Sequence, residues 1–340
     1  MASDSKIEWT DATVNFWWGC TKVGPGCDHC YAESWDRRTG GSHWGLNAPR
    51  RKIASAVKLI HRLDNQYADW AADVECMVGN AKAFGLPVPN LRTTRRVFIQ
   101  SMSDLFDLEV PIDWFSEAWG RIEVCNRIDI QIVTKRISAV EKRLAAAGVA
   151  QWPQHAGLMV TVVNQEELDR DVPRLLALKA KFNIPWVGLS VEPMLGPISL
   201  RWAKWDDWTN GKGEQRETVD HLDGARRLDW VIVGGESGRD ARAMHPNWAR
   251  GLRDECAEAG VPFFFKQWGE WAPSTPEDAA GNPRSGWKCL AGHPHVAKAA
   301  ELYPEAGAAF IEHKGKKAAG RHLDGVLHNA MPQADGRGRG

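Results

Sequence analysis

The sequence lacks an excess of charge of either sign, because its 340 residues carry 43 lysines and arginines against 43 aspartates and glutamates. Global charge therefore gives no argument for nucleic acid or a membrane surface as a partner. The chain also lacks any apolar run that approaches the roughly 20 residues of a membrane span. Residues 1–16 are polar and mixed, without the basic start and apolar stretch of a secretory signal. We therefore expect a cytoplasmic chain with no membrane partner.

Cysteine is sparse, with seven in the chain, but three of the seven lie together at a C-x6-C-x2-C spacing. These are Cys20, Cys27 and Cys30, in a loop where Gly24 and Gly26 allow the chain to curl back. Thiolate sulfur is a soft ligand that suits iron–sulfur clusters, zinc or copper(I). Three thiolates leave either a fourth protein ligand or an open coordination position, and chemistry at a metal needs the open position.

Two other interpretations of this loop remain. A disulfide with one free thiol is disfavoured, because a cytoplasmic chain keeps its thiols reduced. A structural zinc site would take His29 or His43 as its fourth ligand. Zinc fingers usually pair two ligand pairs across a dozen or more residues, and no second C-x2-C pair follows here. An open iron–sulfur site is the favoured interpretation.

Short apolar runs alternate with helical stretches along the chain. The runs that predict strands are 14–18, 96–100, 128–133, 158–163, 186–191, 230–233 and 261–265. The stretches that predict helices are 31–38, 53–83, 114–124, 140–147, 166–181 and 248–259. Continuous apolar strands alternating with helices indicate an α/β fold, here a full or partial (β/α) barrel of parallel strands. Catalytic groups in such barrels lie at the carboxyl ends of the strands, where the polar clusters of this sequence fall.

The pattern also suggests a division of the chain. We expect a barrel over residues 1–271, with insertions at about 39–95 and 203–227. A C-terminal extension is expected over 272–332, and a disordered tail over 333–340. Eighteen tryptophans are unusual; we expect most to pack in the core and some to offer flat surfaces in a cleft.

Several motifs, spread over nearly the whole chain, carry a resemblance. They are IEWTDAT (7–13), the cysteine loop with the residues that follow it (19–33), SMSDLF (101–106), TKR (134–136), VGGESG (233–238), FFKQWG (264–269) and GRHLDG (320–325). Together they resemble the bacteriophage-associated three-cysteine proteins, a family of unknown function that is considered similar to radical S-adenosylmethionine (SAM) enzymes.

That resemblance implies a radical SAM-like barrel and a 4Fe-4S cluster held by Cys20, Cys27 and Cys30. It further implies that SAM chelates the fourth iron and that an external electron donor drives cleavage to a 5′-deoxyadenosyl radical. The sequence departs from the common C-x3-C-x2-C spacing, because its first interval is three residues longer. Longer spacings occur in accepted members of the radical SAM group.

Residues at the ends of other strands are candidates for holding SAM. Ser101, Ser103 and Asp104 could hold its amino group, although serine and aspartate also favour helix N-caps. The remaining cofactor candidates are Ser190, Glu192, Gly234, Gly235 and Glu236. A carboxylate accepts paired hydroxyl donors such as those of a ribose, and glycine permits close backbone approach.

A second group of strand-end residues suits the substrate. Lys135, Arg136 and Lys266 could bind a phosphate or carboxylate, or could form a solvated rim. Gln267 and Trp268 follow directly and are added to the substrate-binding candidates. No residue is singled out as the catalytic acid, base or hydrogen donor.

Three functional hypotheses follow. The first is a radical SAM-type enzyme acting on a nucleotide or nucleic acid, in repair or modification, with any partner protein unknown. The second is a zinc-stabilised nucleic-acid-binding module without catalysis. The third is a hydrolase or nuclease that uses Asp104, Glu192 and Glu236 to hold Mg²⁺ or Mn²⁺.

Overall fold

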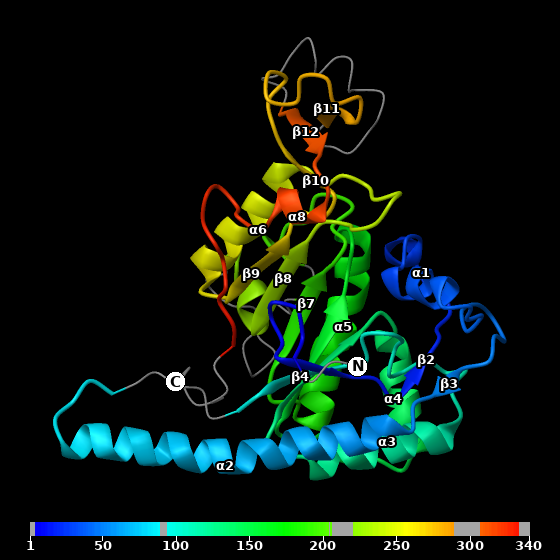
Figure 1. Ribbon diagram of the computed structural model, residues 1–340, viewed down its shortest axis with the longest axis vertical. Helices are drawn as coiled ribbons and strands as arrows, with labels where there is room; N and C mark the ends of the chain where they lie inside the picture. The colour runs from blue at the N-terminus through cyan, green and yellow to red at the C-terminus, as the bar shows by residue number, and fades with distance from the viewer. Residues whose placement is uncertain (1–3, 89–93, 204, 206–219, 289–306, 333–340) are drawn as a thin grey trace.

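The computed structural model describes residues 4–88, 94–203, 205, 220–288 and 307–332 (Figure 1). Seven strands form its central sheet, in the order β1-β4-β5-β6-β7-β8-β9. They are β1 (Ala12–Val14), β4 (Arg96–Ile99), β5 (Asp129–Thr134), β6 (Ala156–Thr161), β7 (Val187–Val191), β8 (Trp230–Gly234) and β9 (Phe263–Gln267). Every neighbouring pair is parallel. Parallel strands in chain order form a half-barrel, so the prediction of an α/β partial barrel is confirmed.

Helices lie between the strands along the chain, and all but the first contribute residues to the main core with the sheet. They are α1 (Tyr31–Arg38), α2 (Ser55–Ala83), α3 (Ile112–Val124), α4 (Ile137–Ala146), α5 (Gln165–Phe182) and α6 (Pro246–Ala259). Each lies within a few residues of its predicted range. The sequence sets their ends: Asn164 accepts a bond from the backbone N–H of Glu167 to begin α5, and Gly260 ends α6 at φ 70°. None of the described helices is long and apolar enough to cross a membrane.

The first strand does not lie where the sequence predicted it. Residues 14–18 were expected to be one strand, but the sheet contains β1 (Ala12–Val14), and β2 (Trp17–Trp18) pairs antiparallel with β3 (Arg51–Lys52). Phe16 explains the break, because its N–H donates to Gln100 Oε1 at 2.5 Å and its carbonyl accepts from Ile53 N–H at 2.8 Å. These two bonds turn the chain out of the sheet and toward the cysteine loop.

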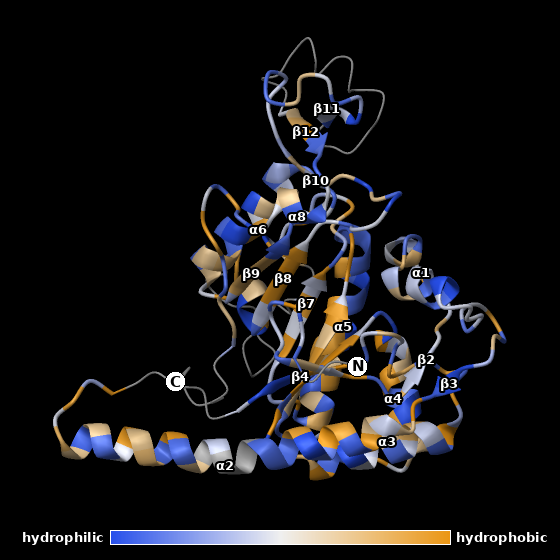
Figure 2. Ribbon diagram, in the orientation of Figure 1, coloured by the Kyte–Doolittle hydropathy of each residue, from blue (hydrophilic) through white to orange (hydrophobic). Residues whose placement is uncertain are grey.

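The two faces of the sheet bury different sets of side chains. Strand residues such as Val97 and Ile99 pack with the helices in the main core, and Figure 2 shows the apolar centre of the sheet. The inner face carries a smaller cluster of Trp9, Met159, Trp230, Ile232 and Phe264. About half of the tryptophans in the described ranges are buried and pack in the interior: Trp9, Trp17, Trp119, Trp152, Trp205, Trp230, Trp248 and Trp268.

The C-terminal region begins at the carboxyl end of β9. A small antiparallel sheet has the order β10-β12-β11, and the short helix α8 (Lys316–Ala319) follows it (Figure 1). Its strands are β10 (Trp271–Pro273), β11 (Ser285–Lys288) and β12 (Ala309–His313). The chain then returns beside β9, where Phe265 N–H donates to His328 O at 3.0 Å. Parts of the expected regions lie outside the described residues: 89–93, 204 and 206–219 of the two insertions, 289–306 of the extension, and the tail at 333–340.

Candidate functional site

A cavity of about 450 Å³ opens at the carboxyl ends of the strands. All but two of the predicted site residues line it: Cys20, Cys27, Cys30, Ser101, Ser103, Asp104, Lys135, Arg136, Ser190, Glu192, Gly235, Glu236, Lys266 and Gln267. The two exceptions are Gly234 and Trp268. Because these residues come from five strand ends and the cysteine loop, the fold gathers positions that are up to 247 residues apart (from 20 to 267).

The cysteine loop lies over the ends of β6 and β7. A Cβ atom at Gly26 would stand 2.7 Å from Cγ1 of Val163, so the close approach requires glycine there. Cys20, Cys27 and Cys30 are free thiols, each partly exposed, and α1 begins directly after Cys30. All three cysteines therefore line the same cavity.

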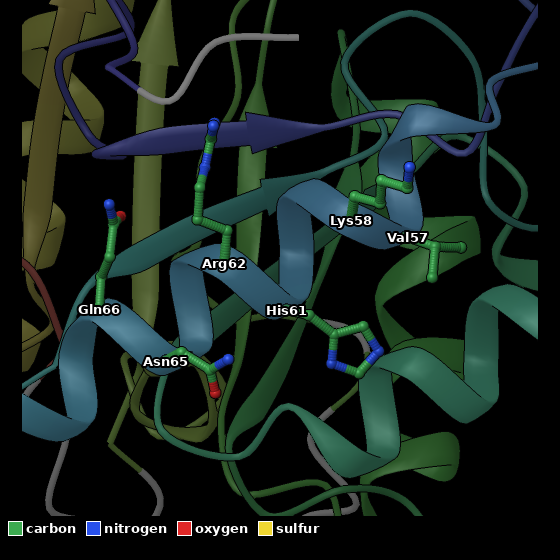
Figure 3. Close-up of a pocket in the computed structure, with 6 residues that line it drawn as sticks. All are labelled: Val57, Lys58, His61, Arg62, Asn65 and Gln66. Carbon is green, nitrogen blue, oxygen red and sulfur yellow. The ribbon is translucent and has the colours of Figure 1, made fainter.

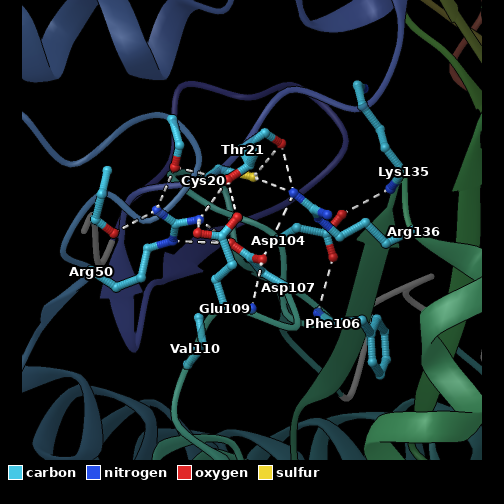
Figure 4. A network of polar contacts seen from close by, with 12 residues as sticks. Cys20, Thr21, Arg50, Asp104, Phe106, Asp107, Glu109, Val110, Lys135 and Arg136 are labelled. Carbon is cyan, nitrogen blue, oxygen red and sulfur yellow. Dashed lines mark hydrogen bonds and ion pairs between the residues drawn. The ribbon is translucent and has the colours of Figure 1, made fainter.

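Arg136 and Arg50 bind the start of this loop (Figure 4). Arg136 Nη2 lies 3.6 Å from Cys20 Sγ and donates to Thr21 O at 2.6 Å. The buried Arg50 pairs with the buried Asp107 at 2.9 Å and donates to Thr21 Oγ1 at 2.7 Å. Two guanidinium groups thus fix the loop against the chain that follows β4.

Burial raises the pKa of the Cys20 thiol to about 12; Asp104 adds to this shift, and Arg136 opposes it. Burial also raises the pKa of Cys30. These thiols hold their protons at neutral pH unless a bound metal replaces the proton. Metal binding at this loop would therefore release protons.

Asp104 is fully engaged by the protein. Its carboxylate accepts from Thr134 Oγ1 at 2.8 Å, from Lys135 N–H at 2.9 Å and from Phe106 N–H at 3.0 Å. Burial raises its pKa against the opposing effect of Arg136 and these bonds. The carboxylate joins the loop after β4 to the end of β5, in the manner of a local turn cap.

The two serines beside it are also bound. Asn15 Nδ2 donates to Ser101 Oγ at 2.9 Å, and Gln100 Nε2 donates to Ser103 Oγ at 2.9 Å. Ser103 Oγ in turn donates to Trp17 O at 3.0 Å. These contacts tie the chain after β1 to the end of β4, so both serines serve the wall of the cavity.

Glu192, Ser190 and Lys266 form a compact polar group on the inner face. Lys266 Nζ lies 2.9 Å from Glu192 Oε1, and Ser190 Oγ donates to Glu192 Oε2 at 3.2 Å. Gly234 makes room for this group, because a Cβ there would stand 2.7 Å from Glu192 Oε1. Each carboxylate oxygen has a single described partner, and an ionised carboxylate offers about four acceptor positions. This group therefore retains capacity for a ligand.

Glu236 holds the other side of the cysteine loop. It accepts from Arg242 through N–H at 2.7 Å, Nε at 2.8 Å and Nη2 at 2.6 Å, and His29 Nδ1 lies 3.0 Å from it. Arg242 also donates to Asp28 Oδ2 at 3.0 Å and to Pro25 O at 2.8 Å. Although burial opposes the shift, Arg242 holds the pKa of Glu236 below its ordinary value.

The remaining candidates lie at the end of β9. Gln267 Nε2 donates to Ser237 Oγ at 2.8 Å, on the cavity wall. Trp268 is only 4% exposed, and its Nε1 donates to His322 O at 2.9 Å. A Cβ at Gly235 would stand 1.9 Å from the carbonyl oxygen of Trp268, so the Gly234-Gly235 pair admits protein groups on both sides.

Sequence reasoning missed four residues that build the site. Asn15 and Gln100 are polar residues that follow strands, which is the signal that could have found them. Arg50 and Arg242 lie in irregular segments where no pattern marks them. Only their contacts across the fold reveal their roles.

The histidines proposed as zinc ligands are engaged by carboxylates. His29 contacts Glu236, and His43 Nδ1 lies 2.7 Å from Asp36 Oδ1. Within the described ranges, no group of three or more His, Cys, Asp or Glu side chains is arranged to hold a metal ion.

A second hollow lies elsewhere, along α2 (Figure 3). The six residues that line its volume of about 590 Å³ all belong to this one helix: Val57, Lys58, His61, Arg62, Asn65 and Gln66. None of the predicted site residues is among them. We therefore assign the candidate site to the cavity below the cysteine loop.

The family model described as "Protein of unknown function (DUF5131)" matches residues 4–332. The chain belongs to this family. No curated protein matches it. Among solved structures, one mutant of spore photoproduct lyase is similar at 12% identity and a TM-score of 0.38, over 78% of this chain and 78% of that one. A second mutant of that enzyme is similar at 13% identity and a TM-score of 0.33, over 89% and 74%. The match to the family model spans both the cysteine loop and the C-terminal region.

Proposed function

We propose that this protein is a radical SAM-type iron–sulfur enzyme, with its active site in the cavity below the cysteine loop. The observation that carries the proposal is that Cys20, Cys27 and Cys30 line one cavity together with polar groups from the carboxyl ends of the strands. Three thiolates are a donor set for an iron–sulfur cluster with one open iron position. When bound, a 4Fe-4S cluster and SAM would supply one-electron reductive cleavage and a 5′-deoxyadenosyl radical.

The chain's own residues divide into two roles in this proposal. Cys20, Cys27 and Cys30 would hold the cluster. Glu192 with Ser190 would accept hydroxyl donors of SAM, because this carboxylate keeps free acceptor capacity beside Lys266. Asp104 and Glu236, whose oxygens are bound within the protein, would position the wall and the loop.

The proposed substrate is a nucleotide or nucleic acid, to be repaired or modified. Three lysines support it, since Lys135, Lys266 and Lys316 line the cavity and suit a phosphate. Tyr31 and Trp44 line the same cavity and offer aromatic surfaces for a base. A cytoplasmic location and an external electron donor belong to the same proposal.

The contacts of the acidic residues favour this function over a carboxylate-metal hydrolase. Asp104 binds Thr134, Glu192 binds Lys266 and Glu236 binds Arg242. A two-metal or one-metal site needs carboxylates that face a shared ion, and here each carboxylate has its own separate partner.

The deciding experiment is anaerobic purification and reconstitution of the full chain, followed by iron, sulfide and zinc analysis. The protein is then mixed with dithionite and SAM, and 5′-deoxyadenosine is measured. We expect about four irons per chain and a brown colour, as thiolate-held clusters give, together with 5′-deoxyadenosine formation. One zinc per chain without SAM cleavage would overturn the proposal in favour of the zinc-stabilised module.

Cys27→Ala is the matched test of the cysteine assignment. We expect it to lose the cluster and all 5′-deoxyadenosine formation, because two thiolates cannot replace three. Cys76→Ala is the control, since Cys76 is a free, exposed thiol on α2. Equal iron loss in both variants, or none in either, would contradict the assignment.

A further inference from the structure

Arg136 makes the closest described contact between a cation and a cysteine of the loop. Its Nη2 lies 3.6 Å from Cys20 Sγ and also donates to Thr21 O at 2.6 Å. The side chain is only 14% exposed, so water screens this charge little. Arg136 was predicted to bind an anionic substrate, but its guanidinium points at the cysteine loop (Figure 4).

The carboxylates of Asp107 and Asp104 lie near Arg136, but both also bind other groups. Asp107 Oδ1 lies 3.8 Å away, whereas Asp107 Oδ2 lies 2.9 Å from Arg50 Nη2. Arg50 therefore takes the closer ion pair with Asp107. Asp104 is bound by Thr134 and by the backbone of Lys135. Thr21 O and Asp107 therefore hold the Arg136 guanidinium in place beside Cys20 Sγ.

We propose that Arg136 sets the reduction potential of the cluster through Cys20, and that it is a positioning and tuning residue rather than a substrate ligand. This inference rests on the proposed function. A one-electron reductant such as dithionite would add one negative charge to the cluster. Hydrogen bonds to ligand sulfurs and nearby charge both set the potentials of such clusters. A cation beside Cys20 stabilises the added charge, so it makes the potential less negative.

The test is a potentiometric titration of the anaerobically reconstituted full chain, with the reduced cluster followed by electron paramagnetic resonance. Arg136→Gln keeps an N–H donor and removes the charge, whereas Arg136→Lys keeps the charge and removes the planar fork. We expect Arg136→Gln to shift the midpoint to a more negative potential, and Arg136→Lys to stay near the wild type. Lys6→Met is the control, because Lys6 lines the same cavity with no described bond to a cysteine.

The midpoint is measured on whatever fraction carries a cluster, so partial loading does not hide the effect. An unchanged midpoint in Arg136→Gln would overturn the inference and leave the proposed function standing. Equal shifts in the Gln and Lys variants would also overturn it, since geometry rather than charge would then matter. A wild-type chain that takes up no cluster would overturn the inference and the proposed function together.

Discussion

The cysteine loop (residues 19–30) and the C-terminal segment (residues 320–329) are two motif-bearing regions that the fold uses in different ways. The loop lines the cavity, and Arg136 and Arg242, from the segments that follow β5 and β8, donate hydrogen bonds to it. In the segment, Leu323 is completely buried and Asp324 pairs with Arg250 and Arg253 of α6. A distinctive sequence motif can therefore mark either chemistry or the docking of a chain end. The contacts of its residues tell the two apart.

Leu323→Ala is expected to give the largest change in stability. Leu323 is fully buried in the main core, so removing its side chain should lower the free energy of unfolding by about 2–5 kcal/mol. Urea denaturation measures this loss. Leu327→Ala is the matched control on the same segment, because Leu327 is 45% exposed and surface changes usually stay within about 0.5 kcal/mol. Iron bound per folded chain should stay unchanged in both variants. A lower iron content in Leu323→Ala would contradict the conclusion that the C-terminal segment serves stability alone.

Arg242→Met should affect both stability and the loop. It leaves the Glu236 carboxylate, whose side chain is 5% exposed, with His29 as its main described partner. An unsatisfied buried group costs about 1–3 kcal/mol of unfolding free energy. The variant also loses the bonds to Asp28 and Pro25, so we expect faster proteolytic cleavage of the loop.

Arg37→Met provides the control for this prediction. Arg37 is 73% exposed and pairs with Glu33 on α1, near the same loop. An exposed ion pair contributes at most about 1 kcal/mol, so cleavage within residues 19–30 should keep its wild-type rate. If both variants were cleaved equally fast, Arg242 would not be the clamp that the contacts indicate.

The sequence predicted the architecture well because its signals are local. Apolar runs and helical periodicity placed six of the seven sheet strands and the helices within a few residues. The first strand was misplaced, since Phe16 is turned away by Gln100, a contact across 84 residues. The sequence also predicted that the polar residues at the strand ends lie together, because parallel strands have their carboxyl ends at one edge of the sheet.

The sequence did not predict which hydrogen bonds and ion pairs each of these side chains makes. Asp104, Glu192 and Glu236 were all candidate ligands, yet Asp104 caps a turn and Glu236 contacts His29 of the cysteine loop. Their partners Thr134 and Arg242 come from other elements, and no local pattern encodes such pairings. Trp268 was predicted to bind substrate, but the structure places it in the core beside the C-terminal segment.

Asp324→Asn should give the smallest change in the free energy of unfolding, and this change should depend on pH. Hydrogen bonds from Arg250 above all, and from Arg253, lower the pKa of Asp324 to about 2, although burial opposes them. The pair is 37% exposed on both sides, so we expect it to contribute about 1 kcal/mol. A depressed pKa stabilises the fold above the ordinary value of 3.8, and this contribution is lost as pH falls toward 2. Urea denaturation of both chains along a falling pH series, over the range where both stay folded, should show the difference shrinking below pH 3.8. A difference that stayed constant there would mean that Asp324 holds the segment by packing rather than by charge.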